Sequence, residues 1–185
     1  MLRRHLLPAA LLVLATAGCG PDRPPAPPTP PSTAAIEGPV ALHVALGAGE
    51  RLSQRTDGSG DCPGLSATVD LGRAGAVTLV AYASTCEHGD NTHPGNGRHG
   101  VYRGPSDIPA ERHGTAVATA LGPATVFEQP YYECTNSCST FTEPVAVIVL
   151  DHPADPAYPV LTAYSAKGTA GRDRLTALVR DQLRP

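Results

Sequence analysis

Three histidines, two acidic residues and four glycines fall within the stretch CEHGDNTHPGNGRHG, residues 86–100. Imidazole nitrogens and carboxylate oxygens bind zinc and copper, and a glycine-rich loop can fold around an ion. A zinc or copper site formed by His88, His93 and His99 is therefore one hypothesis. Their spacing, however, matches no ligand pattern such as H-E-x-x-H, and glycine, asparagine and histidine are common in exposed turns. The primary prediction is thus a loop without a cofactor, and the metal site is the alternative.

Two further motifs lack the context that their chemistry requires. GNGRHG at residues 95–100 has the form G-x-G-x-x-G, but a dinucleotide site needs a strand before it and a helix after it, and the flanking residues favour neither. DGSGD at residues 57–61 begins like a calcium loop, but Cys62 stands where that loop needs glycine and Thr68 where it needs glutamate. The sequence also contains no G-x-S-x-G motif. We therefore predict no catalytic residues, and an exported hydrolase is only the third hypothesis.

The first eighteen residues are typical of an export signal. Arg3 and Arg4 provide the positively charged start, and the apolar run at residues 6–15 is too short to cross a bilayer as a permanent helix. We therefore predict that residues 1–18 are a signal peptide and that the mature chain is extracytoplasmic.

The signal leads into TAGC, residues 16–19, which resembles the lipobox of bacterial lipoproteins of the actinobacterial type. The resemblance implies that cleavage leaves Cys19 as the first residue and that acyl groups on its sulfur anchor the chain to the membrane. It covers only the signal and this cysteine. Thr16 stands where the family usually has leucine, and ATA at residues 15–17 also suits the ordinary signal peptidase, so plain secretion is the alternative.

Lipidation of one of the five cysteines leaves four. In an oxidising compartment, four cysteines can form two disulfides. Three pairings of the other four are possible. We predict the pairs Cys62–Cys86 and Cys134–Cys138, because each pair brackets a turn-rich segment. Closing the longer loop stabilises the fold by about 3.5 kcal/mol and closing the shorter one by about 2 kcal/mol.

Residues 19–34 predict a linker, and residues 35–185 a single globular domain. Seven prolines between residues 20 and 33 favour the polyproline II conformation, which would hold the domain about 40 Å from its anchor. Without residues 1–18 the chain has 12 basic and 17 acidic residues, a net charge of −5 with neutral histidines. No basic run interleaved with aromatic residues occurs, so no nucleic-acid partner is expected.

Hydrophobic alternation within the domain is typical of half-buried strands. The chain ends in an amphipathic segment, residues 172–183, with leucine and valine on one face. We therefore predict an α+β fold, an antiparallel β-sheet of about six to eight strands with one C-terminal helix packed on it, stabilised by disulfides. The poorly aliphatic residues 84–113 predict a long loop with a short strand at residues 100–104. The predicted strands are residues 40–47, 65–72, 76–83, 115–121, 124–129, 144–150 and 159–166.

Paired tyrosines lie beside the shorter predicted disulfide, in EQPYYECTNSC at residues 128–138. Tyr131 and Tyr132 on a braced turn would form a recognition surface, since aromatic residues anchor interfaces. Alternatively, one tyrosine packs in the core and the other covers the disulfide. The leading functional hypothesis is a non-catalytic binding module of the cell envelope, with an envelope protein, a glycan or a small ligand as its partner. The alternative is a metal-binding lipoprotein that uses the histidine-rich loop, residues 86–113.

Overall fold

The computed structural model describes residues 31–55, 64–86, 96–100 and 102–185. Its strands form a three-stranded sheet in the order β1-β2-β10 and a seven-stranded sheet in the order β3-β4-β5-β9-β8-β7-β6, and all neighbouring strands are antiparallel. The strands are β1 (Ser32–Ile36), β2 (Leu42–Leu46), β3 (Arg51–Arg55), β4 (Gly64–Asp70), β5 (Ala76–Tyr82), β6 (Thr115–Thr119), β7 (Gly122–Cys134), β8 (Cys138–Val149), β9 (Val160–Tyr164) and β10 (Leu183–Arg184). The predicted α+β class, an antiparallel sheet with one C-terminal helix, is confirmed.

The alternation of apolar and polar residues in the sequence correctly predicted the strands that have one buried face. The hairpin predicted from residues 65–72 and 76–83 is formed by β4 and β5. The apolar run at residues 144–150 belongs to β8, which lies inside the large sheet, and β9 is its antiparallel partner as predicted. Of the short strand considered at residues 100–104, the described residues 100 and 102–104 belong to no strand.

Three strands carried no such signal. β1 begins at Ser32, within the predicted linker, and its side chains are mostly exposed. β3, with the sequence RLSQR, is a largely exposed edge strand. β10 has two residues and pairs with β2. None of the three shows the alternation of a half-buried strand, although Ile36 of β1 and Leu183 of β10 are buried in the core.

The C-terminal helical segment begins and ends close to the predicted positions but changes its winding. α1 (Arg172–Ala177) is α-helical, and Leu178–Gln182 continues it as one π-helical turn. Leu175, Leu178 and Val179 are fully buried. Within the described residues, no helix combines the length and the apolar character needed to cross a bilayer. Short 3-10 helices lie at Gly72–Ala74, Pro105–Asp107, Ala110–Arg112 and Ala166–Gly168.

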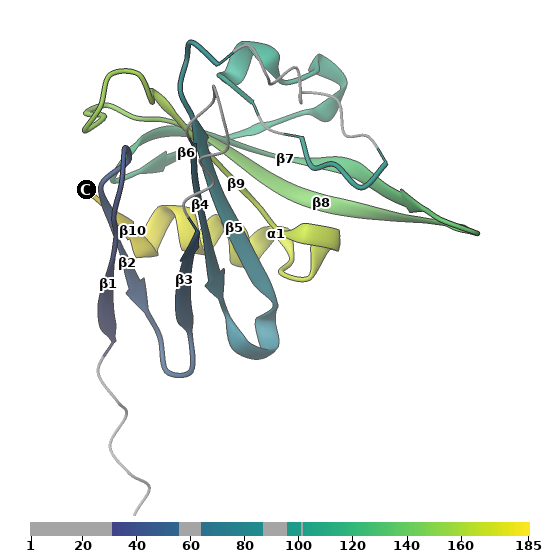
Figure 1. Ribbon diagram of the computed structural model, residues 1–185, viewed down its shortest axis with the longest axis horizontal. Coiled ribbons are helices and arrows are strands. Elements are labelled where there is room, and N and C mark those ends of the chain that lie inside the picture. The colour runs from purple at the N-terminus through teal and green to yellow at the C-terminus, as the bar shows by residue number, and fades with distance from the viewer. Residues whose placement is uncertain (1–30, 56–63, 87–95, 101) are drawn as a thin grey trace, which may run out of the picture.

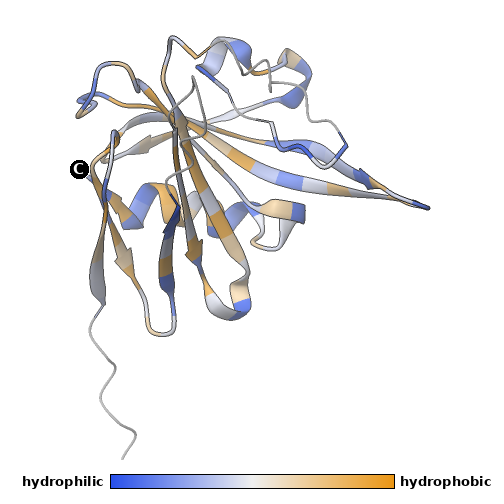
Figure 2. Ribbon diagram, in the orientation of Figure 1, coloured by the Kyte–Doolittle hydropathy of each residue, from blue (hydrophilic) through white to orange (hydrophobic). Residues whose placement is uncertain are grey.

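Buried side chains form two clusters, one on each face of the large sheet. The larger cluster joins the apolar face of the helical segment to one face of the sheet and to the small sheet. The smaller cluster lies on the opposite face, where Tyr102 packs edge-on against Phe127 with Val145 and Val147 beside them. The segment 102–113, which we call the covering segment, thus covers the face of the sheet that the helix leaves open. In Figure 2 the strands are most hydrophobic in the body of the sheet.

The paired strands β7 and β8 are much longer than their neighbours, and their ladder runs from Ala124↔Ile148 to Cys134↔Cys138. Figure 1 shows the end of this hairpin projecting beyond the rest of the molecule along its longest axis. We call residues 130–142 the arm. Apart from Tyr131, none of the arm's side chains is buried. The arm is therefore a hairpin that presents both of its strands to solvent, and its base is embedded in the sheet.

Candidate functional site

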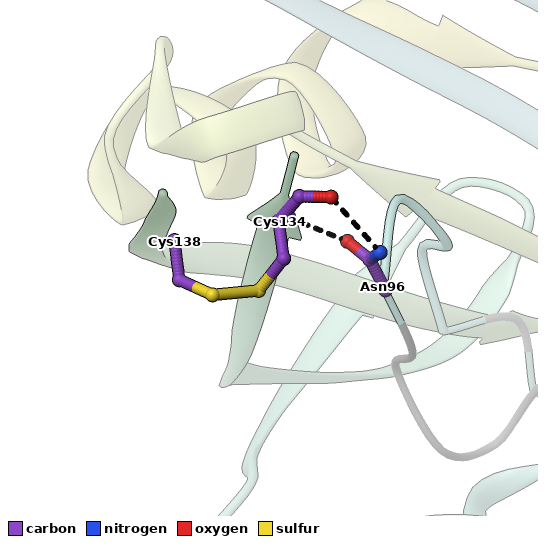
Figure 3. The surroundings of a disulfide bond; sticks show 3 residues. All are labelled: Asn96, Cys134 and Cys138. Atoms are coloured by element: carbon purple, nitrogen blue, oxygen red, sulfur yellow. Dashed lines mark hydrogen bonds between the residues drawn. A yellow bond between two sulfur atoms is a disulfide. The ribbon is translucent and has the colours of Figure 1, made fainter. Parts of the chain in front are cut away.

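The segment 96–100 lies along the arm, bringing His99 to it. Asn96 makes a parallel bridge with Tyr132, and the backbone N–H of Gly97 donates to the carbonyl of Tyr132 at 2.9 Å. The Asn96 side chain also donates to the carbonyl of Cys134 and accepts from the N–H of Cys134, at 3.2 and 2.6 Å. Figure 3 shows these two hydrogen bonds beside the disulfide. Asn96 therefore occupies backbone groups on the outer edge of β7.

The imidazole of His99 is enclosed between two tyrosine rings. Its centroid lies 4.5 Å from that of Tyr131, at an interplanar angle of 10°, and 4.4 Å from that of Tyr164, at 25°. The His99 side chain is 24% exposed, so only an edge of the ring reaches solvent. Stacking on both faces fixes the plane of the ring and decides which way its two nitrogens point.

Glu143 is the fully buried group toward which His99 points. His99 Nδ1 lies 3.0 Å from both carboxylate oxygens of Glu143, which is 0% exposed. The backbone N–H of Lys167 donates to the same carboxylate at 2.6 Å, and Gln129 Nε2 donates at 3.4 Å. Glu143 thus accepts from three different elements. The buried carboxylate is satisfied by donors, as its removal from water requires.

A tight turn brings the backbone N–H of Lys167 to Glu143. Lys167 has a φ of +55° and Gly168 a φ of +67°, the left-handed region that glycine enters without strain. A Cβ at Gly168 would also collide with the carbonyl of Thr142. Glycine at residue 168 is therefore required for the close approach of this turn to β8.

The network continues from Glu143 to the covering segment. Tyr102 donates its hydroxyl proton to Gln129 Oε1 at 2.7 Å, while Gln129 Nε2 faces Glu143. Gln129 is 1% exposed and Tyr102 is also buried. We call His99, Tyr102, Gln129, Tyr131, Glu143 and Tyr164 the His99 cluster. It connects His99 and Tyr102 to three strands of the sheet at the base of the arm.

Charged groups form the outer margin of this cluster. Lys167 Nζ lies 2.8 Å from Glu133 and 5.5 Å from the ring centroid of Phe141. Hydrogen bonds from Lys167 and then from Tyr131 hold the pKa of the Glu133 carboxyl below its usual range. Tyr131 donates its hydroxyl to Glu133 at 2.7 Å. The Lys167–Glu133 ion pair holds these two side chains in place beside the cluster. Because both side chains are partly exposed, the pair contributes little to the free energy of unfolding.

Two tyrosines of the cluster should lose their hydroxyl protons at a higher pH than a free tyrosine. Burial raises the pKa of Tyr102 to about 12, and burial together with the hydrogen bond and charge of Glu133 raises that of Tyr131 to about 12. Because the folded chain then holds protons that an unfolded tyrosine loses near pH 10, stability should fall as the pH rises from 10 to about 12. Absorbance at about 295 nm tests this. The rise in absorbance near pH 12 should be smaller in Tyr102→Phe and in Tyr131→Phe than in the unsubstituted chain. An unchanged titration curve in both variants would contradict the raised pKa of these two tyrosines.

The two tyrosines predicted as one recognition surface point to opposite sides of the arm. Tyr132 is 40% exposed, whereas Tyr131 is 3% exposed and stacks on His99. The reason is the alternation of side chains along a strand, which sends adjacent residues to opposite faces. A joint surface of both residues is therefore not formed. Tyr132 remains as the exposed aromatic residue of the arm.

The predicted metal site is only partly within the described residues. His88 and His93 lie outside them, and His99 directs Nδ1 to Glu143. Among the described residues, no group of three or more histidine, cysteine or acidic side chains could hold a metal ion. A carboxylate behind one imidazole nitrogen is, however, the arrangement that orients the other nitrogen of a metal-binding histidine. The metal hypothesis thus stays a prediction that involves His99 Nε2.

The disulfide predicted between Cys134 and Cys138 is present, and it closes the tip of the arm. Cys86 is also disulfide-bonded. Its predicted partner Cys62 and the predicted lipidation site Cys19 lie outside the described residues, so both assignments stay predictions. Arg103 donates to the backbone carbonyl of Cys86 and thereby connects this half-cystine to the covering segment.

Four members of the His99 cluster were not predicted from the sequence: Tyr102, Gln129, Glu143 and Tyr164. One signal was available: Phe141, Glu143, Val145 and Val147 alternate along β8, so a carboxylate occupies a position whose neighbours on the same face are apolar. An acidic residue in such a row predicts a buried charge with specific partners. The partner His99 is 44 residues distant in the chain, and no local pattern reveals it.

No protein-family model matches the chain, and no curated protein or solved structure matches it significantly.

Proposed function

We propose that this chain is an exported, lipid-anchored protein whose domain is a non-catalytic binding module of the cell envelope and that the arm is its contact element. The observation that carries the proposal is the form of the arm, a solvent-exposed hairpin that extends beyond the body of the sheet (Figure 1). A protruding hairpin costs conformational entropy and buries little apolar surface, so stability alone does not account for it. Contact with a partner would account for it.

Three features prepare the arm for binding. Cys134–Cys138 closes its tip, Asn96 occupies the outer edge of one strand, and the His99 cluster fixes its base. A surface that is already ordered loses less entropy on binding. The exposed side chains are mostly hydroxyl and amide groups around one aromatic residue, Tyr132, a composition that suits a polar partner such as a glycan or a protein surface.

Replacing Tyr132 with alanine should weaken binding to isolated cell envelopes about ten- to thirtyfold, because an exposed tyrosine is a typical interface anchor. The measurement is saturable co-sedimentation of the full chain carrying Cys19→Ala, so that lipid insertion makes no contribution. The matched control is Tyr82→Ala, since Tyr82 is 38% exposed and lies on β5 away from the arm. The wild-type affinity should persist in the control. Equal losses in both variants, or none in either, would reject the arm as the contact element.

Cys19→Ala should release the protein from the membrane fraction into the medium, because loss of the acyl groups on the sulfur removes the anchor. Immunoblotting of fractionated cells measures the distribution. The matched control is Cys138→Ala, which leaves the anchor intact. Persistence of the Cys19→Ala chain in the membrane fraction would show that the anchor assignment is wrong.

An exported hydrolase is the second candidate, and the His99–Glu143 pair favours it. Donation from Nδ1 to the carboxylate leaves the lone pair of a neutral imidazole on Nε2. Within the described residues Nε2 has no hydrogen-bond partner, and the His99 side chain is 24% exposed. A carboxylate-oriented histidine with an open nitrogen can act as a general base. Turnover of nitrophenyl ester or phosphate probes, abolished by His99→Gln, would favour this candidate over the binding module.

A further inference from the structure

β6 is the last strand of the seven-stranded sheet, and no other described strand pairs with its outer edge. Within the described residues it pairs with β7 alone, from Thr115↔Val126 to Thr119↔Gly122. Soluble proteins usually protect such an edge with lysine, proline or a bulge, because its free N–H and C=O groups accept another strand. The sequence of β6, TAVAT, contains no charged residue and no proline. This edge therefore lacks the usual protection against pairing.

A groove lies over β6 and the beginning of β7. It has a volume of about 450 Å³ and is open to solvent, and its lining is mainly apolar. It is lined by residues 116–119 of β6, by Gly122, Pro123 and Ala124 at the start of β7, and by Asp151. Small side chains leave the backbone of β6 accessible, so an extended strand can approach it closely.

The sequence of β6 reads the same in both directions. We propose that β6 pairs antiparallel with β6 of a second copy of this chain, around a twofold axis at Val117. In that register Thr115 faces Thr119 of the second copy, Ala116 faces Ala118, and Val117 faces its own equivalent. A twofold interface must be self-complementary, and a palindromic strand satisfies this at every position. The two sheets become one continuous sheet, with both C-terminal helices on the same side.

The faces of β6 fit this arrangement. Val117 packs against the core on the helix side, and Arg172 of α1 donates to Thr115 Oγ1 at 2.9 Å on that side. Ala116 and Ala118 are exposed on the opposite face. Cross-strand Thr–Thr pairs therefore form on one face and Ala–Ala pairs on the other, and neither pair brings charges of the same sign together.

Charges at the two ends of β6 are complementary across the twofold axis. Arg172 lies at the Thr115 end of β6, where it donates to the Thr115 hydroxyl. Asp151 marks the other end, where its N–H donates to the carbonyl of Leu121 at 2.9 Å and its side chain borders the groove. The antiparallel register places Arg172 of each copy at the same end as Asp151 of the other. Opposite charges at both ends favour this register over a shifted one.

Two matched double variants test the register. Ala116→Lys with Ala118→Lys places two pairs of lysines opposite each other, whereas Ala116→Lys with Ala118→Glu places lysine opposite glutamate in both pairs. Sedimentation equilibrium of the full chain carrying Cys19→Ala measures self-association up to about 0.5 mM, because a five-residue strand pair is a small interface. The unsubstituted edge and the lysine–glutamate variant should dimerise, and the lysine–lysine variant should associate at least about tenfold more weakly. A monomer throughout this range for the unsubstituted edge, or equal association of the two variants, overturns the proposal.

A cysteine cross-link keeps the test decisive if the lysine–lysine variant does not fold. Val117→Cys places two identical thiols opposite each other at the twofold axis and should give a disulfide-linked dimer under mild oxidation. Ser53→Cys, on the opposite edge strand β3, is the control and should remain monomeric. Cross-linking at Ser53→Cys but not at Val117→Cys, or at neither position, would overturn the assignment of β6.

Discussion

Replacing Glu143 with alanine should lower the free energy of unfolding by about 3–5 kcal/mol. The carboxylate accepts hydrogen bonds from His99 Nδ1, from the backbone of Lys167 and from Gln129, and it is fully buried. Removing it leaves these donors without their acceptor and creates a cavity, and each unsatisfied buried donor costs about 1–3 kcal/mol. Urea denaturation followed by circular dichroism measures the change.

The matched control for this substitution is Glu128→Ala. Glu128 lies on β7 of the same hairpin but is exposed, so its removal should change the stability by less than about 0.5 kcal/mol. If Glu143→Ala were no more destabilising than Glu128→Ala, the role of Glu143 as the centre of the His99 cluster would be wrong.

Phe127→Ala should be destabilising by about 3–5 kcal/mol, because a large aromatic side chain is lost from a closed core. Phe127 is completely buried on β7, and its ring meets that of Tyr102 edge-on at a centroid distance of 5.1 Å. This contact holds the covering segment on the sheet. The same denaturation experiment measures the loss, and hydrogen exchange of residues 102–113 should increase with it.

The other phenylalanine of the chain provides the control. Phe141 is only half-buried on the arm, where it contacts Tyr131 and Lys167. Phe141→Ala should cost about 1 kcal/mol and leave the exchange of the covering segment unchanged. A larger loss at Phe141 than at Phe127 would show that the arm, rather than the face beneath the covering segment, carries the second core.

Sequence patterns predicted the elements whose stability comes from one buried face. β2, with Leu42, Val44 and Leu46 buried, shows the alternation that pleating requires. The same reasoning fails for β1 and β3, because backbone pairing at a sheet edge leaves no hydrophobic signature. It also underestimated the lengths of β7 and β8, since most residues of the arm are polar and resemble a loop in composition.

The site was predictable only in part. His99 was identified as a residue capable of chemistry, and the Cys134–Cys138 disulfide was identified from its turn-rich loop. The role of His99 depends on Glu143 and Tyr164, which belong to strands far along the chain. Long-range strand pairing brings them together, and a local pattern contains no information about that pairing.

Site-specific photo-cross-linking in living cells tests the central claim, that the arm contacts a partner, most directly. A photoreactive phenylalanine derivative replaces Tyr132 on the arm or, as the matched control, Tyr82 on β5, two tyrosines with exposed fractions of 40% and 38%. Irradiation should give a discrete adduct of higher mass from position 132 and none from position 82. The absence of an adduct at position 132, or the same adduct from both positions, would contradict the claim that the arm is the binding element.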